Sequence, residues 1–253
     1  MSKGYLIAAA FGAWIAGAGI LQAAVITVPN SAANASVGSA NVFPFTFAST
    51  LVPSMRYQQV FDASQFSAIA SGGEFLTQVA FRREIDSEPF SISIAEIQIN
   101  LSTTAAKPDQ LSFTFVDNVG SDDTVVLDQG PLTLASTFVG PQGTLTPFDV
   151  SIVFDRPFFY DPAEGNLLLD VRNFSGGSLN TSLEVTGEAL SRVFRGDVFA
   201  TTAPTDNSTT VGLVTQFSTQ VPEPTAEVLF AVGLAAFVAN RRIVGRRWVA
   251  TFS

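Results

Sequence analysis

The chain has 253 residues, 47% of them apolar and 14% charged, and its formal net charge is −9. It contains neither cysteine nor histidine, which excludes disulfides, thiol nucleophiles, cysteine-ligated zinc, histidine-ligated metals and a Ser-His-Asp triad. Residues 24–220 carry twenty acidic against eight basic side chains, and such an acidic segment repels a phosphate backbone, so we expect no nucleic-acid partner.

Residues 1–23 have the features of a secretory signal peptide. Lys3 gives a short basic start, an apolar run covers 6–21, and small residues follow at Ala23 and Ala24. We therefore predict export through the Sec translocon and cleavage by signal peptidase between Ala23 and Ala24. An uncleaved N-terminal membrane anchor is the alternative interpretation.

Residues 24–220 predict an all-β domain. Short segments rich in Phe, Val, Ile, Leu and Thr are separated by Gly, Pro, Asn, Asp and Ser, and helical periodicity is nearly absent. About a dozen strands at this spacing indicate a two-sheet antiparallel β-sandwich of jelly-roll type. The expected strands are 42–47, 55–61, 75–82, 90–100, 111–115, 124–127, 132–138, 150–154, 167–171, 183–188, 191–199 and 212–219.

The spacing of apolar residues predicts details of individual strands. In 90–100 the alternation changes phase between Ile94 and Ile97, which predicts a β-bulge at the two residues between them. Segments 150–154 and 167–171 have denser apolar runs, as expected of central strands that are buried on both faces.

Other local signals concern the connections. Asp62 precedes a segment, 62–69, that could form one short helix with Asp62 as its N-terminal cap. Segments 26–41 and 201–210 are rich in Ser, Thr, Ala and Asn, so we expect loops there. Nineteen of the 23 phenylalanines fall within 24–220, enough to fill the core of a sandwich.

Residues 221–253 form a tail of three parts. A proline-containing motif at 221–224 is followed by an apolar stretch at about 225–239 and by arginines at 241–242. The stretch is shorter than the roughly 20 residues that a helix needs to cross the ~30 Å hydrocarbon core. We therefore expect a marginal membrane helix with the arginines on the cytoplasmic side.

This tail resembles the PEP-CTERM sorting signal of exported proteins in Gram-negative bacteria that make extracellular polysaccharide. The residues that carry the resemblance are Val221, Pro222, Glu223, Pro224, Arg241 and Arg242. The resemblance implies recognition by an exosortase-type membrane transpeptidase, removal of the tail and delivery from the membrane to the cell surface or medium. The chain departs from the family pattern by continuing through 243–253. An ordinary C-terminal anchor with a chance Pro-Glu-Pro is the alternative.

One loop is a candidate calcium site. Calcium takes six to eight oxygen ligands, and extracellular calcium suits weak sites. The candidate ligands are Asp117, Asn118, Asp122 and Asp123. The spacing does not match an EF-hand loop, and the favoured alternative is an Asx-rich turn that satisfies its own backbone. We expect no other cofactor.

The preferred functional interpretation is a non-enzymatic exported surface or matrix protein, associated with exopolysaccharide or biofilm. One alternative is a carbohydrate-binding module, for which Tyr57 and Tyr160 would be the only tyrosine platforms because residues 24–220 contain no tryptophan. The other alternative is a carboxylate-dependent glycan hydrolase. The candidate catalytic acids are Glu74, Glu84, Glu96, Glu184 and Glu188. No spacing among them selects a catalytic pair.

Overall fold

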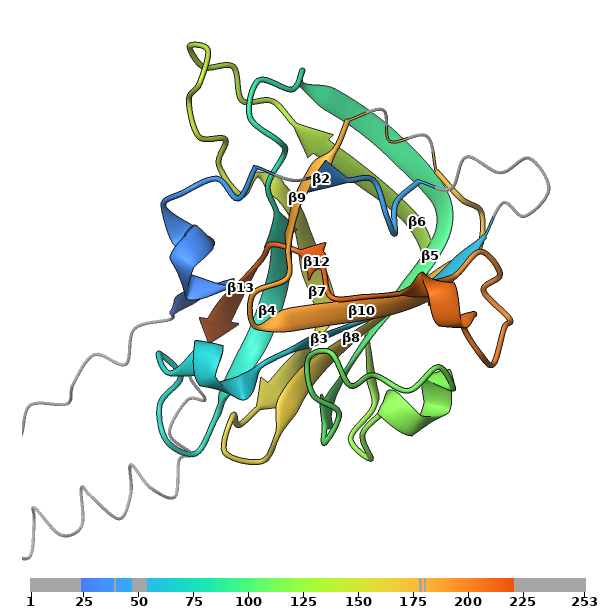
Figure 1. The fold of residues 1–253 in the computed structure, drawn as a ribbon. Coiled ribbons are helices and arrows are strands. Elements are labelled where there is room, and N and C mark those ends of the chain that lie inside the picture. The colour runs from blue at the N-terminus through green and yellow to red at the C-terminus, as the bar shows by residue number, and fades with distance from the viewer. Residues whose placement is uncertain (1–23, 39, 47–53, 178, 180, 221–253) are drawn as a thin grey trace, which may run out of the picture.

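The computed structural model is an antiparallel all-β fold (Figure 1). It describes residues 24–38, 40–46, 54–177, 179 and 181–220. The predicted signal peptide and the predicted sorting tail both lie outside these residues. Within the described ranges, no helix is long and apolar enough to cross a membrane.

Two larger sheets and one small sheet make up the fold. The four-stranded sheet has the order β1-β13-β4-β7 and the six-stranded sheet has the order β11-β10-β3-β8-β5-β6. The small sheet has the order β12-β9-β2, and all the strand pairs in the described residues are antiparallel. The strands are Val25–Val28 (β1), Ala40–Asn41 (β2), Met55–Phe61 (β3), Glu74–Phe81 (β4), Phe90–Thr104 (β5), Thr124–Ser136 (β6), Val150–Tyr160 (β7), Asn166–Asn173 (β8), Leu183–Thr186 (β9), Leu190–Arg195 (β10), Ser208–Thr209 (β11), Gly212–Leu213 (β12) and Thr215–Gln220 (β13).

The inner faces of the two larger sheets enclose one apolar core. The inward side chains alternate along each strand, so that Tyr57 of β3 and Ile99 of β5 meet Val79 of β4 in the same buried cluster. Between the sheets, Phe61 packs edge-on against Phe217 with ring centroids 5.2 Å apart. These contacts give a β-sandwich-like fold, as the sequence predicts.

A second apolar cluster lies on the outer face of the six-stranded sheet. Here a covering loop, residues 105–123, folds back over the outward side chains of β3, β8 and β10. The members of this outer cluster are Val60, Leu111, Phe115, Leu168, Val193 and Ala203. The covering loop therefore covers part of the outer face of the six-stranded sheet.

Several local predictions are confirmed. The register of β5 against β6 shifts between Ile94 and Ile97, where the change of phase predicts a bulge. β8 lies between β3 and β5 and is largely buried along its length, as expected of a central strand. Asp62 caps a helix by accepting a hydrogen bond from the Ser64 backbone at 2.9 Å, although that helix, η2 at Ala63–Phe66, is of the 3-10 type.

Three strand predictions are wrong because apolar alternation does not identify what covers the buried face. Segment 111–115 forms only a bridge at Thr114 and runs into a 3-10 helix, η3 at Phe115–Asn118, because its apolar side chains pack onto the outer face of a sheet. The described part of 42–47 is a turn rather than a strand. The strands expected at 124–127 and 132–138 are one strand, β6.

Three further expectations are corrected at the edges of the sheets. Segment 26–41, expected as a loop, contains most of β1, β2 and a 3-10 helix, η1 at Asn30–Ala33. β7 is an edge strand rather than a central one, and its Val153 is 67% exposed. A fourth 3-10 helix, η4 at Thr205–Asn207, and β11 lie in segment 201–210, which the composition indicates as a loop.

Candidate functional site

The two ends of the described body lie side by side. The backbone N–H of Ala24 donates to Oγ1 of Thr219 at 2.7 Å, and the backbone N–H of Thr219 donates to the Ala24 carbonyl at 2.9 Å. β1 then pairs along its whole length with β13, with Val25 opposite Ser218. Ala24, the first residue after the predicted cleavage site, therefore contacts β13. This strand ends at Gln220, directly before the predicted sorting motif.

The sequence-predicted sorting and cleavage residues are not placed by the structure. Apart from Ala24, they all lie outside the described residues: Ala23, Val221, Pro222, Glu223, Pro224, Arg241 and Arg242. What the structure adds is the position of the body from which these segments continue. Both continue from adjacent strands of the four-stranded sheet (Figure 1).

The four calcium candidates each accept hydrogen bonds from the protein. Asp122 accepts from a backbone N–H of β5 at 2.8 Å, and Asp123 accepts from an asparagine amide of the same strand at 3.0 and 3.1 Å. Asp117 accepts from a serine hydroxyl at 3.0 Å, and the buried Asn118 uses both atoms of its amide group within the covering loop and β3. A search of the described residues shows no group of three or more His, Cys, Asp or Glu side chains that could hold a metal ion. These contacts are typical of an Asx-rich turn.

The candidate catalytic glutamates lie on separate elements. Glu184 is buried in an ion pair with Arg82, and the buried Glu74 accepts a hydrogen bond from the backbone N–H of Ala70 at 3.0 Å. The remaining three, at positions 84, 96 and 188, are exposed. The two buried carboxylates are thus engaged in contacts that hold loops and strands together.

Both tyrosines of the body are fully buried, so neither can serve as a platform for a sugar ring. Tyr160 donates to the Gly165 carbonyl at 2.9 Å, and Tyr57 donates to Oε1 of Gln59 at 2.5 Å. Burial raises the pKa of both phenols above the ordinary value of 10.0. The carbohydrate-binding alternative therefore finds no tyrosine platform at these two positions.

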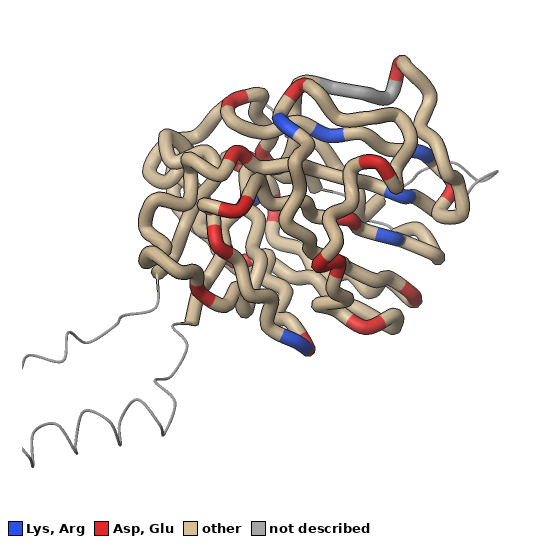
Figure 2. Tube along the Cα trace, turned by 90° about the horizontal axis from the view of Figure 1, so that it is seen from below, with Lys and Arg blue, Asp and Glu red and all other residues tan. Residues whose placement is uncertain are grey.

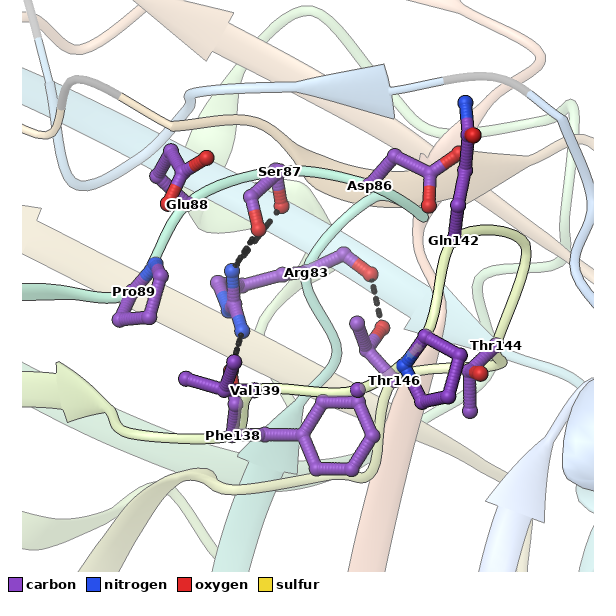
Figure 3. A pocket seen from close by; sticks show the side chains of 12 residues that line it. Arg83, Asp86, Ser87, Glu88, Pro89, Phe138, Val139, Gln142, Thr144 and Thr146 are labelled. Atoms are coloured by element: carbon purple, nitrogen blue, oxygen red, sulfur yellow. Dashed lines mark hydrogen bonds between the residues drawn. The ribbon is translucent and has the colours of Figure 1, made fainter.

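A cavity of about 320 Å³ lies between two loops, the one that joins β4 to β5 and the one that joins β6 to β7 (Figure 3). We call it the Arg83 cavity. Its lining combines the carboxylates of Asp86 and Glu88 and the amide of Gln142 with the apolar side chains of Phe138 and Val139. Its volume is within the range of small-molecule sites.

Arg83 fixes the walls of this cavity. Its buried guanidinium donates from Nε to Oγ of Ser136 at 2.6 Å and from Nη2 to the Phe138 carbonyl at 2.7 Å. Nη1 donates to the carbonyl of Ser87, which lies on the same loop as Arg83 (Figure 3). One side chain therefore ties both loops together and pre-organises the acidic and amide groups that line the opening.

The cavity was not among the sequence-based candidates. Its lining comes from loops more than fifty residues apart, and nothing in the spacing of Asp86, Glu88 and Gln142 shows that they are neighbours. The one available signal is Arg83 itself, which adjoins another arginine at the end of a predicted strand in a segment with few basic residues. Acceptors beside apolar side chains form a surface that could bind a polar molecule of the size of a sugar.

The chain matches no protein-family model, and no curated protein matches it either. The functional interpretation therefore rests on the two terminal segments of the sequence, on the fold and on the contacts described above.

Proposed function

We propose that the protein is a non-enzymatic exported surface or extracellular-matrix protein, sorted by an exosortase-type system and associated with exopolysaccharide. The observation that carries the proposal is the position of the domain boundary. The last strand of the body ends at Gln220, and the motif Val221-Pro222-Glu223-Pro224 follows with no intervening residue. A sorting signal at this place could be removed without loss of any strand.

The adjacency of Ala24 and Thr219 supports the same proposal. In a protein that is cleaved after Ala23 and again after about Pro224, both trimmed ends continue from adjacent strands of one sheet, at Ala24 and at Gln220. The pairing of β1 with β13 then holds the trimmed ends together by backbone hydrogen bonds.

We also infer that the fold is of the jelly-roll type. The four-stranded order β1-β13-β4-β7 stands opposite β3-β8-β5-β6, with β10 and β11 added beside β3. The chain moves between these sheets several times, which supports two Greek-key units rather than two meanders.

The test is the intact mass of the protein recovered from the inner membrane, the outer membrane and the medium of the producing cells. We expect the mature protein outside the inner membrane, with a mass that lacks residues 1–23 and the tail after about Pro224. Deletion of residues 221–253 should abolish surface display. Deletion of residues 243–253 alone is the matched control, because it leaves the motif, the apolar stretch and Arg241 with Arg242, and it should leave display unchanged. A protein that keeps its tail in the inner membrane would overturn the proposal.

A second candidate function, carbohydrate binding, is favoured by the Arg83 cavity. The test is a glycan array probed with the wild type and with Asp86→Asn and Gln142→Ala variants. Binding that these substitutions weaken, and that Asp128→Asn on a different surface does not, would support the second candidate. Absence of binding to every matrix polysaccharide of the producing strain would remove it.

A further inference from the structure

We propose that three arginines on the outer face of the six-stranded sheet bind the acidic groups of a polysaccharide. Arg195 of β10 is directly opposite Arg56 of β3, and Arg56 is directly opposite Arg172 of β8. Residues that are directly opposite each other in antiparallel strands project from the same face. The three therefore form a continuous line across three strands, which we call the arginine row.

The arginine row lies at the margin of the covering loop. On each of its strands the next outward residue, Val193, Gln58 or Asp170, is beneath or beside the outer cluster. The ring of Phe115, from the covering loop, lies 4.7 Å from the guanidinium carbon of Arg56. The loop thus covers one side of the row.

The charge of the row is only partly compensated. Arg56 donates to both carboxylate oxygens of Asp170, at 2.6 and 3.3 Å, and Nη2 of Arg172 lies 3.9 Å from the same carboxylate. Asp170 also accepts from Gln58 at 2.9 Å and is buried. The carboxylate of Asp170 therefore compensates Arg56 and, more weakly, Arg172, and it makes no contact with Arg195. Like charges that are directly opposite each other destabilise a sheet. An anion that bridges the arginines would therefore reduce the repulsion within the row.

Two of the arginines keep unused donors. Arg195 is exposed and makes no side-chain hydrogen bond or ion pair with any residue that the structure describes. Arg172, 33% exposed, has a buried Nε without a hydrogen-bond partner in the same set of residues. A guanidinium offers a planar fork of donors that matches carboxylate, sulfate or phosphate oxygens. The site is therefore suited to a ligand with repeated anionic groups.

An exposed aromatic ring lies near the end of β10 that carries Arg195. Phe199 follows β10 and is 80% exposed, and its ring contacts that of Phe174, which follows β8, at a centroid distance of 6.0 Å. An apolar ring face beside guanidinium groups suits a sugar that carries an acidic substituent, because the C–H face of the sugar can stack while the substituent pairs with arginine. This combination favours an acidic polysaccharide over a simple anion.

The charge distribution of the body is compatible with this site. Most lysines and arginines gather toward one side of the molecule, whereas aspartates and glutamates are spread over all of it, that side included (Figure 2). At physiological ionic strength the Debye length is about 8 Å, so distant carboxylates oppose a bound anion only weakly. Binding should weaken steeply as salt is added.

This inference rests on the proposed association with exopolysaccharide, for which it supplies a site and a ligand charge. The test measures binding of the protein, isolated from the producing cells, to polygalacturonate, dextran sulfate and neutral dextran. Anionic lipid vesicles and single-stranded DNA are included as other polyanions. The variant is Arg172→Gln with Arg195→Gln, which leaves the buried contact between Arg56 and Asp170 intact. The control is Arg156→Gln, which removes one positive charge from an exposed residue on another strand.

We expect both acidic glycans to bind and neutral dextran not to bind. The double variant should bind the acidic glycans at least roughly tenfold more weakly, with the control close to wild type. The inference is overturned if the wild type binds no acidic glycan, if the control loses as much affinity as the double variant, or if vesicles or DNA bind more tightly than the glycans. Correct trimming and display without glycan binding would refute the inference alone, whereas glycan binding by an untrimmed protein would refute the sorting proposal alone.

Discussion

Arg82 and Glu184 form an ion pair with 2.5 Å between Nη2 and Oε2, and each side chain is only 1% exposed. Arg82 follows β4 and Glu184 belongs to β9, so the pair joins the four-stranded sheet to the small sheet. Nε of Arg82 donates to the same carboxylate at 2.6 Å, and Nη2 donates to the Ala35 carbonyl at 2.7 Å. These contacts compensate two charges that would be costly to bury alone.

We therefore predict that Glu184→Gln lowers the free energy of unfolding by about 3–5 kcal/mol, because it leaves a buried guanidinium without its counter-charge. Urea denaturation followed by circular dichroism measures the change. The matched control is Asp128→Asn, which breaks the pair with Arg156 in which both side chains are 55% exposed, and it should cost less than about 1 kcal/mol. Equal effects of the two substitutions would contradict the prediction.

Gly120 should be intolerant of a side chain. A Cβ atom there would lie 1.8 Å from the carbonyl oxygen of Thr103, so the covering loop would have to move away from β5. We expect Gly120→Ala to lower the free energy of unfolding by roughly 1–3 kcal/mol. Gly130→Ala is the control, because the nearest atom to its added Cβ is 3.9 Å away. Chemical denaturation of the two variants in parallel decides the question, and a Gly120→Ala protein as stable as the control would refute the packing argument.

The buried tyrosines predict a loss of stability at alkaline pH. Burial, and secondarily the charges of Asp62 and Asp161, raise the pKa of Tyr160 above 10.0, and burial also raises that of Tyr57. Above about pH 10 the unfolded chain releases these protons while the folded chain retains them, so the free energy of unfolding falls as the pH rises toward the folded-state values. Below about pH 10 this contribution is fully present.

Denaturation at a series of pH values from about 8 to about 12 measures this effect. Tyr160→Phe should cost about 1 kcal/mol at neutral pH, through the lost hydrogen bond to Gly165. The same variant should lose less stability than the wild type at the alkaline end. Parallel pH profiles for wild type and variant would show that Tyr160 does not contribute.

The calcium candidates predict no calcium dependence of stability. Asp122 and Asp123 already accept hydrogen bonds from β5, and Asn118 is fully engaged with its neighbours. We expect the melting temperature to be the same with excess chelator and with millimolar calcium. A rise on calcium addition that Asp122→Asn abolishes, and that Asp128→Asn does not, would instead establish a site in this loop.

The sequence predicts those elements whose signals are local. β3 at Met55–Phe61 agrees with the expected bounds, and the bulge in β5 follows from the phase of its alternating isoleucines. Segment 111–115 alternates equally well, yet its buried face packs on the outside of a sheet. Alternation indicates that one face is buried but not which partner buries it.

The sites depend on relationships that no local pattern contains. Arg56, Arg172 and Arg195 align only because β3 pairs with β8 on one side and β10 on the other. The lining of the Arg83 cavity likewise comes from two distant loops. The burial of Tyr57 and Tyr160 follows from their position on inward faces, and composition alone could not distinguish a core tyrosine from a surface one.

The place of β13 also determines when the body can form. This strand lies between β1 and β4, so the last strand that the structure describes is interior to its sheet, and Ala24 and Thr219 are 195 residues apart in the chain. Until residue 220 is available, β1 has no neighbour in its sheet and β4 has one open edge. The sandwich can therefore close only after β13 has been made.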